Sequence, residues 1–182
     1  MKKLLLSAVV AAFGLVGANA QDSGFEAGAY VGIPVADASD GTSMNVGVTV
    51  AYYFEVMENF KVGGLVGYDH FIGKDQDIDT GFGTITVDGV DAGFIPIAAS
   101  AKYSFGSFFG GLDLGYAIGV SDGAGDGGFL YRPRFGWSSS RVDLYAFYKG
   151  ISYKYDVPSG LGTTSSVSAT AGSVGIGAAF KF

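Results

Sequence analysis

The chain contains no cysteine, one histidine and only four prolines among its 182 residues. Without cysteine, disulfide frameworks, thiolate metal sites and cysteine catalysis are all excluded. Beyond residue 20 the sequence also lacks any apolar run near the ~18 residues that a membrane-spanning helix needs. Yet its mean hydropathy is +0.34 and only 15% of its residues are charged, which is too apolar for a disordered chain. High hydropathy without long apolar runs predicts strands of alternating character.

Basic residues are scarce as well. Without Lys2 and Lys3, nine basic side chains stand against 17 acidic ones, which leaves a net charge of −8. Nucleic-acid binding needs a basic patch, so we expect no nucleic-acid partner. The Gly-rich segment 123–128 is followed by neither the Lys nor the helix of a phosphate loop, so we expect no nucleotide cofactor.

The first twenty residues have the pattern of a secretory signal peptide. Lys2 and Lys3 precede an apolar stretch over 4–16, and Ala18 and Ala20 form a small-residue cleavage site. An uncleaved membrane anchor is the alternative, but the apolar stretch is short and the cleavage site follows it directly. We therefore expect a cleaved signal peptide over 1–20 and a mature domain over 21–182.

In the mature domain, apolar and polar residues alternate with the period of two that indicates half-exposed β-strands. We expect eight strands. The first, second and sixth run over about 24–35, 44–55 and 129–137. The third, fifth and seventh begin at 60, 108 and 142, and the fourth and eighth end at 105 and 182. In the seventh strand the alternation becomes unclear beyond Tyr148, which suggests a β-bulge near Gly150.

The connections between these strands alternate in length. Short ones are expected at 56–59, 106–107 and 138–140, and longer polar ones at 36–43, 73–89, 121–128 and 156–168. Residues 84–89 have the pattern of an additional hairpin, which is too short to cross a bilayer and is placed above it. The sequence therefore predicts an all-β fold, an eight-stranded antiparallel up-and-down transmembrane β-barrel with both ends on the short-turn side.

Aromatic residues favour a membrane barrel over a soluble barrel or sandwich. On the face that we predict to point outward, aromatic residues recur eight positions apart, as at Phe60 and Tyr68. Eight residues of a tilted strand climb ~20 Å, near the height between two aromatic girdles. The predicted girdle at the short-turn, periplasmic end consists of Tyr52, Phe54, Phe60, Tyr103, Phe105, Phe108, Trp137, Phe180 and Phe182.

The face that we predict to point inward is rich in glycine and charge. Its five acids and five bases are Glu26, Glu55, Asp69, Asp113, Asp143, Lys61, Lys102, Arg132, Arg134 and Lys181. Unpaired charges in a narrow lumen are costly, so we expect a structural network of ion pairs. The three pairs that we predict are Glu26–Lys181 at the closing seam, Arg134–Asp143 beside the third short turn, and Asp113–Arg132. Because inward glycines contribute no volume, a wet and narrow lumen remains an alternative to a filled one.

The terminal Phe182 follows Ile176, Ala178 and Phe180 at alternate positions, which resembles the last-strand signature of bacterial outer-membrane proteins. With the export signal and the turn rhythm, the whole mature chain resembles the small eight-stranded barrels of the OmpA/OmpX kind. The resemblance implies a monomer in the bacterial outer membrane, in contact with lipid and lipopolysaccharide. It also implies that the barrel-assembly machinery recognises Phe182. It implies no single function, because the family includes anchors, adhesins, resistance factors and a few lipid-modifying enzymes.

Two local patterns invite a chemical role. Lipid A-modifying barrels use a His with a Ser and an acid. Here Asp69 lies beside His70 in the sequence, but the two side chains are expected to point to opposite faces of the strand. The ordinary interpretation of His70 is therefore a histidine at the solvent-exposed edge of the barrel. Asp75, Asp77 and Asp79 alternate like calcium ligands, without the Gly and Glu spacing of a calcium loop. We expect no enzyme, no cofactor and no dedicated metal site.

The sequence thus favours a non-enzymatic outer-membrane barrel that acts in envelope structure or in surface interaction through acidic extracellular loops. The loops over 73–89 and 156–168 are the expected contact surface for a surface ligand. The first alternative is a narrow channel for small solutes whose luminal charges set selectivity. The second is a lipid A-modifying enzyme that uses His70.

Overall fold

The computed structural model describes residues 24–79, 84–159 and 163–182, so the predicted signal peptide over 1–20 lies outside the described residues. Eight strands form one closed barrel in the order β1-β10-β9-β8-β7-β6-β3-β2. These strands are β1 (Gly24–Ala36), β2 (Thr42–Met57), β3 (Phe60–Gly73), β6 (Ala92–Phe105), β7 (Phe108–Gly119), β8 (Gly127–Ser138), β9 (Val142–Ser159) and β10 (Thr163–Lys181).

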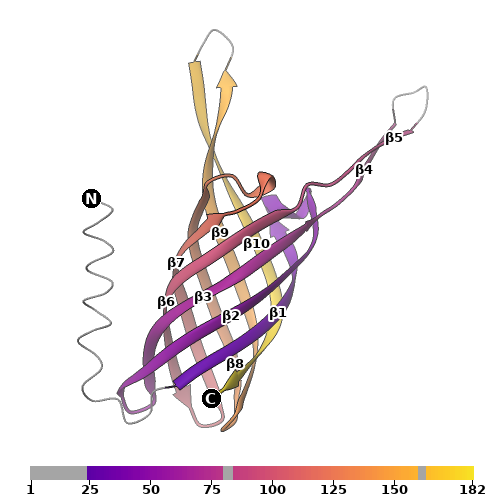
Figure 1. The fold of residues 1–182 in the computed structure, drawn as a ribbon. Helices are drawn as coiled ribbons and strands as arrows, with labels where there is room; N and C mark the ends of the chain where they lie inside the picture. Colours follow the sequence, from indigo (N-terminus) through magenta and orange to yellow (C-terminus); the bar gives the residue numbers. More distant parts are fainter. Residues whose placement is uncertain (1–23, 80–83, 160–162) are drawn as a thin grey trace.

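All eight neighbouring pairs in the barrel are antiparallel, and each strand lies beside its neighbours in the sequence (Figure 1). The ring closes between the first and last strands, where Glu26 lies opposite Lys181. The predicted all-β, eight-stranded antiparallel up-and-down barrel is therefore confirmed. In the part of the chain that the structure describes, no helix is long and apolar enough to cross a membrane.

Three tight turns join the strands at one end of the barrel, and both barrel termini lie at that same end (Figure 1). Asn59 and Gly106 each adopt a φ of 65° in two of these turns. Glycine and asparagine tolerate this left-handed region better than other residues, which explains their presence there. The opposite end carries the longer connections, which include the short 3₁₀ helices η1 (Asp37–Ser39) and η2 (Asp122–Ala124).

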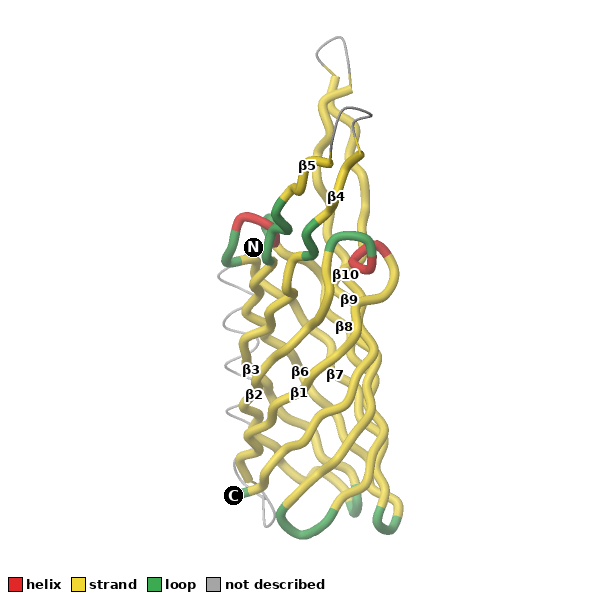
Figure 2. Tube along the Cα trace, turned by 90° about the vertical axis from the view of Figure 1, so that its right-hand side faces the viewer, coloured by secondary structure: helices red, strands yellow, loops and turns green. Residues whose placement is uncertain are grey.

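The longest hairpin extends well beyond the barrel wall at the long-loop end (Figures 1 and 2). The β9–β10 ladder runs without interruption from the Val142–Phe180 pair to the Ser159–Thr163 pair. The prediction of a loop over 156–168 is therefore wrong for most of that segment. Threonine and valine suit an extended backbone, and β9 and β10 continue to pair with each other beyond the point where their other neighbouring strands end.

A second, smaller hairpin leans away from the barrel at the same end (Figure 1). It pairs β4 (Gln76–Asp79) with β5 (Thr84–Val87) in a separate two-stranded sheet. The sequence predicted an additional hairpin over 84–89, and the structure corrects its bounds. The first strand is the acidic segment that the alternating aspartates had marked as a loop.

The predicted bulge near Gly150 does not form. Residues on both sides of Gly150 keep one register with β8 and with β10. Irregularities occur instead at the two ends of the β2–β3 ladder. The alternation of β9 therefore continues past Tyr148, and Lys149 points into the barrel, where it is 1% exposed.

Large aromatic rings fill the space that inward glycines leave. A Cβ atom on Gly47 would collide with the ring of Tyr30, and one on Gly177 would collide with the ring of Tyr145. Tyr30, Tyr145, Phe109 and Phe147 form one buried aromatic cluster in the interior. Gly47 and Gly177 thus make room for the rings of bulky neighbours, which occupy part of the interior.

This packing predicts that Gly47→Ala lowers the free energy of unfolding by about 1–3 kcal/mol, because the added methyl group displaces the buried Tyr30 ring. The measurement is urea unfolding of the refolded chain in detergent, followed by heat-modifiable gel mobility. Gly110→Ala is the matched control, since no atom lies within 4 Å of its added Cβ. Equal unfolding curves for the two variants contradict the account.

Candidate functional site

Many of the charged side chains that the structure describes gather inside the barrel. Four acids and four bases are buried there: Glu26, Asp69, Asp113, Asp143, Lys102, Arg132, Arg134 and Lys149. They belong to three clusters along the barrel axis. Each of the eight occupies an inward-facing position of its strand, because alternate residues of a strand point to the same side of the barrel wall.

The middle cluster is centred on Asp113. Arg132 Nε donates to Asp113 Oδ2 at 2.8 Å, and Arg134 Nη2 donates to Asp113 Oδ1 at 2.9 Å. Arg134 Nη2 also donates to the hydroxyl oxygens of Tyr53 and Ser100, at 2.8 and 3.1 Å. One carboxylate therefore accepts from two guanidinium groups, and the hydroxyls satisfy the second arginine further.

The cluster nearest the long-loop end is centred on Lys149. Its Nζ donates to a carboxylate oxygen of Asp69, and to Asn45 Oδ1 at 2.7 Å. Ser173 Oγ donates to the same Asn45 oxygen at 3.0 Å. The rings of Tyr30 and Phe71 cover the ammonium group, each with its centroid 4.9 Å from Nζ.

The cluster nearest the short turns crosses the barrel. Lys102 Nζ on β6 donates to Glu26 Oε1 on β1 at 2.8 Å and to Asp143 Oδ2 on β9. Lys181 Nζ lies 2.7 Å from Asp143 Oδ1 and also donates to Ser138 Oγ at 2.7 Å. This cluster ties the closing seam to the third short turn.

Of the three predicted ion pairs, only Asp113–Arg132 is present as predicted. The predicted Arg134–Asp143 pair is wrong, because Arg134 binds Asp113. The predicted Glu26–Lys181 pair is wrong as well: the two residues lie opposite each other on neighbouring strands, but Glu26 binds Lys102. Glu26 finds its partner across the narrow interior, because Lys102 reaches it from the non-adjacent strand β6, whereas Arg134 on β8 turns to the adjacent strand β7 instead of β9.

The remaining predicted luminal residues lie at the rim. Lys61 Nζ is 3.9 Å from Glu55 Oε2, and both side chains are about one-third exposed. Five members of these clusters were not predicted from the sequence: Lys149, Asn45, Ser173, Tyr53 and Ser100. Continuing the alternation of β9 from Asp143 to residue 149 would have found the lysine, because both positions have the same parity.

The nine aromatic residues assigned to the short-turn girdle all point outward and are partly or largely exposed. Several touch one another, as in Tyr52–Phe54 and Phe105–Phe108, whose ring centroids are 4.8 and 6.5 Å apart. Near the opposite end, the outward aromatic residues are Tyr68, Tyr116, Phe129, Tyr131 and Tyr148.

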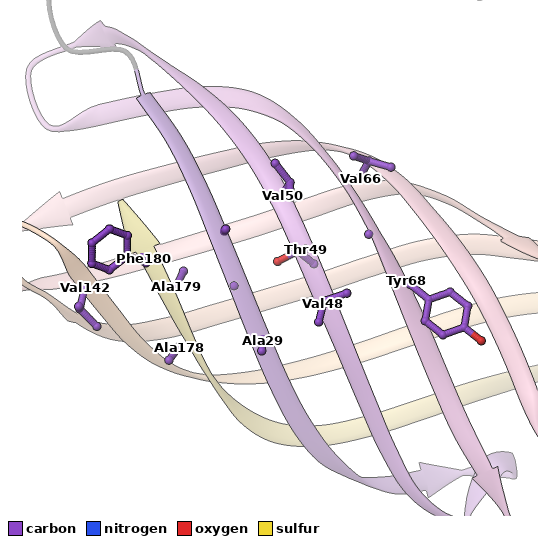
Figure 3. Close-up of a pocket in the computed structure, with 13 residues that line it drawn as sticks. Ala29, Val48, Thr49, Val50, Val66, Tyr68, Val142, Ala178, Ala179 and Phe180 are labelled. Atoms are coloured by element: carbon purple, nitrogen blue, oxygen red, sulfur yellow. The ribbon is translucent and has the colours of Figure 1, made fainter. Parts of the chain in front are cut away.

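Depressions in the outer surface of the described barrel include two that are lined mostly by apolar residues. One, of about 770 Å³, lies over β1, where Ala27, Ala29 and Ala178 are small and Tyr68 and Phe180 stand on its margins (Figure 3). The other, of about 900 Å³, lies over β2, β3, β6 and β7. The described residues that line them include neither acid nor base, so both suit hydrocarbon and neither suits a polar substrate.

At the long-loop end, His70 forms a clasp with Asp91. His70 Nε2 lies 3.2 Å from Asp91 Oδ2, and Tyr68 Oη lies 3.3 Å from His70 Nδ1. The Gly73 amide donates to Asp91 Oδ1 at 2.8 Å. Asp69 is buried inside the barrel, so the prediction that Asp69 and His70 point to opposite faces is confirmed. The clasp joins the end of β3 to the start of β6.

The described parts of the chain contain no group of three or more acidic or histidine side chains arranged to hold a metal ion. The predicted acidic segment around Asp77 lies in β4. No family model and no curated protein matches this sequence. The function must therefore be inferred from the way the charged, aromatic and aliphatic side chains are distributed over the barrel.

The Lys149 cluster predicts a large effect of removing one charge. Lys149→Met leaves Asp69 buried without its cation and should lower the free energy of unfolding by about 3–5 kcal/mol. The double variant Lys149→Met/Asp69→Asn should recover part of this loss, because no buried charge remains unpaired. Urea unfolding in detergent measures both.

Lys61→Met is the control for these variants. Its ion pair is long and partly exposed, so its loss should cost less than about 1 kcal/mol. If Lys149→Met is as mild as Lys61→Met, the buried pair does not stabilise the barrel as described.

The Asp91 clasp predicts a pH-dependent structure at the barrel mouth. The Gly73 amide, and secondarily His70, hold the pKa of Asp91 below its ordinary value. Because the folded pKa lies below the unfolded one, the clasp is fully formed above the unfolded value and is lost as the pH falls through the folded one. The Gly73 amide resonance should therefore titrate with a midpoint below the ~3.9 of an ordinary aspartate.

The titration is followed by NMR of the refolded chain in detergent micelles. Asp91→Asn should abolish the acid titration of the Gly73 amide, and Asp88→Asn, which changes a neighbouring exposed acid, should leave it intact. A Gly73 titration that survives in Asp91→Asn rules out the clasp as its source.

Proposed function

We propose that the chain is a bacterial outer-membrane protein whose barrel spans the bilayer and anchors its outer loops, without catalysing a reaction. One observation carries this proposal, the reversed distribution of side chains. Aliphatic residues such as Val48, Ile97 and Ile176 are about half or more exposed on the outer wall, while charged residues are buried inside. A continuous apolar wall is an aggregation hazard in water and is solvated in lipid.

The dimensions and the aromatic residues support the same proposal. β7 and β8 contain 12 residues each, close to the ~9–11 that a tilted strand needs to cross a bilayer. Outward aromatic residues near both ends match the two interfacial girdles of such barrels. The short turns then face the periplasm and the long connections face the exterior.

The filled interior favours an anchor over the alternative of a narrow channel. Arg132, Lys149 and Asp113 are at most 2% exposed, and aromatic rings pack against the inward glycines. The contacts of His70 with Asp91 and Tyr68 fit a structural clasp better than the catalytic site of a lipid A-modifying enzyme. The proposed role is therefore envelope structure or surface interaction, with the β9–β10 and β4–β5 hairpins presented outside the membrane.

The single tryptophan tests the membrane position of the barrel. After refolding into phospholipid vesicles, Trp137 fluorescence should be quenched most by lipids brominated near the headgroup, because Trp137 lies in the girdle at the short-turn end. In the double variant Trp137→Phe/Phe135→Trp the tryptophan lies two residues deeper on the same outward face. Bromines placed further down the acyl chain should then quench it better.

Failure of both tryptophans to respond to brominated lipid overturns the proposal. The same holds if the mature chain stays folded and soluble without detergent or lipid. Heat-modifiable gel mobility verifies in each sample that the barrel has folded.

A further inference from the structure

The β4–β5 hairpin and the residues that join it to the barrel, 74–79 and 84–91, form an arm at the long-loop end. Its base is held at several points. Lys74 N donates to Gly41 O at 2.9 Å, and Gly89 N donates to Asp75 Oδ1 at 2.9 Å. The Asp91 clasp fixes the other side of the base to Gly73. The arm therefore leaves the barrel in a defined direction, to the side of the barrel axis (Figure 1).

One face of the arm presents apolar side chains. Ile85 and Val87 are alternate residues of β5, so both point to the same side of the hairpin. They are 57% and 49% exposed, and Val90 at the base is 63% exposed. The aliphatic residues of the barrel wall have lipid to cover them under the proposed function, whereas the arm lies beyond the membrane. Its apolar face therefore calls for a different cover.

The arm is also strongly acidic. Its sequence contains Lys74 against five aspartates, which are Asp75, Asp77, Asp79, Asp88 and Asp91. Among them, Asp75 and Asp88 flank the hairpin with exposed side chains. Anionic lipid headgroups are repelled by such a surface, and a cationic partner is attracted to it.

We infer that this face of the arm docks an extended basic segment of a partner protein, which carries apolar residues at alternate positions and Lys or Arg at its ends. The apolar side chains of the segment cover Ile85, Val87 and Val90, and its cations meet the flanking aspartates. An extended segment places every second side chain ~7 Å apart on one face, which matches the spacing of Ile85 and Val87. The inference rests on the proposed function, because it requires the arm to stand outside the membrane.

Binding of designed peptides to the mature chain in phospholipid vesicles tests this inference. The probe is a twelve-residue peptide in which Val and Ser alternate in the centre and two Lys stand at each end, and the comparison peptides replace Lys by Glu or Val by Ser. The Lys–Val peptide should bind more tightly than either. Ile85→Ser/Val87→Ser should weaken its binding ~10-fold or more through lost apolar burial. Asp75→Asn/Asp88→Asn should weaken it ~3-fold, an effect that disappears at high salt.

The conservative variant Ile85→Val/Val87→Ile is the matched control and should bind within ~2-fold of the unchanged chain. Equal binding by the Ser variant, or equal binding of the Glu–Val peptide, overturns the inference. A chain that inserts into vesicles but binds none of the peptides overturns the inference and leaves the proposed function intact. A chain that does not insert overturns both.

Discussion

The buried charges inside the barrel must neutralise one another, and much of the interior is arranged around that requirement. Removing one partner of a buried ion pair costs several kcal/mol, because the other charge has no access to water. Asp113 therefore accepts from two arginines, and the hydroxyl oxygens of Tyr53 and Ser100 accept further bonds from Arg134. Since these residues come from β2, β6, β7 and β8, the same contacts hold the barrel wall together from within.

Aromatic rings and glycines complete the filling of the interior. Where an inward glycine lies under an aromatic ring, the absence of its side chain leaves the space that the ring occupies, as Gly47 does for Tyr30. The rings also cover the cations: Lys102 Nζ lies 4.7 Å from the centroid of Phe109. The interior of the barrel can therefore be both charged and closed to solvent, and its charged side chains stabilise the barrel. The surface available for interaction then moves to the hairpins at the mouth.

The fold could be predicted from the sequence because a period of two, over many residues, allows only one side of each strand to face the interior. The same alternation places the luminal charges on one side. It does not identify their partners, because Lys102 reaches from β6 to β1 and β9, and strand order describes only adjacent strands. Lys149 was not predicted, because the sequence pattern beyond Tyr148 indicated a bulge that does not form. The Asp91 clasp was not predicted, because loop residues have no periodicity. The first strand of the arm, β4, was not predicted because it contains two aspartates, which are uncommon in strands.

The central claim is that the luminal network fills the barrel, so conductance of the refolded mature chain in planar lipid bilayers tests it most directly. The account predicts that a chain shown to be folded by its gel mobility passes no discrete current steps. Reproducible steps in the unchanged chain whose size or selectivity responds to Asp113→Asn would contradict it, because ions would then pass through the Asp113 cluster.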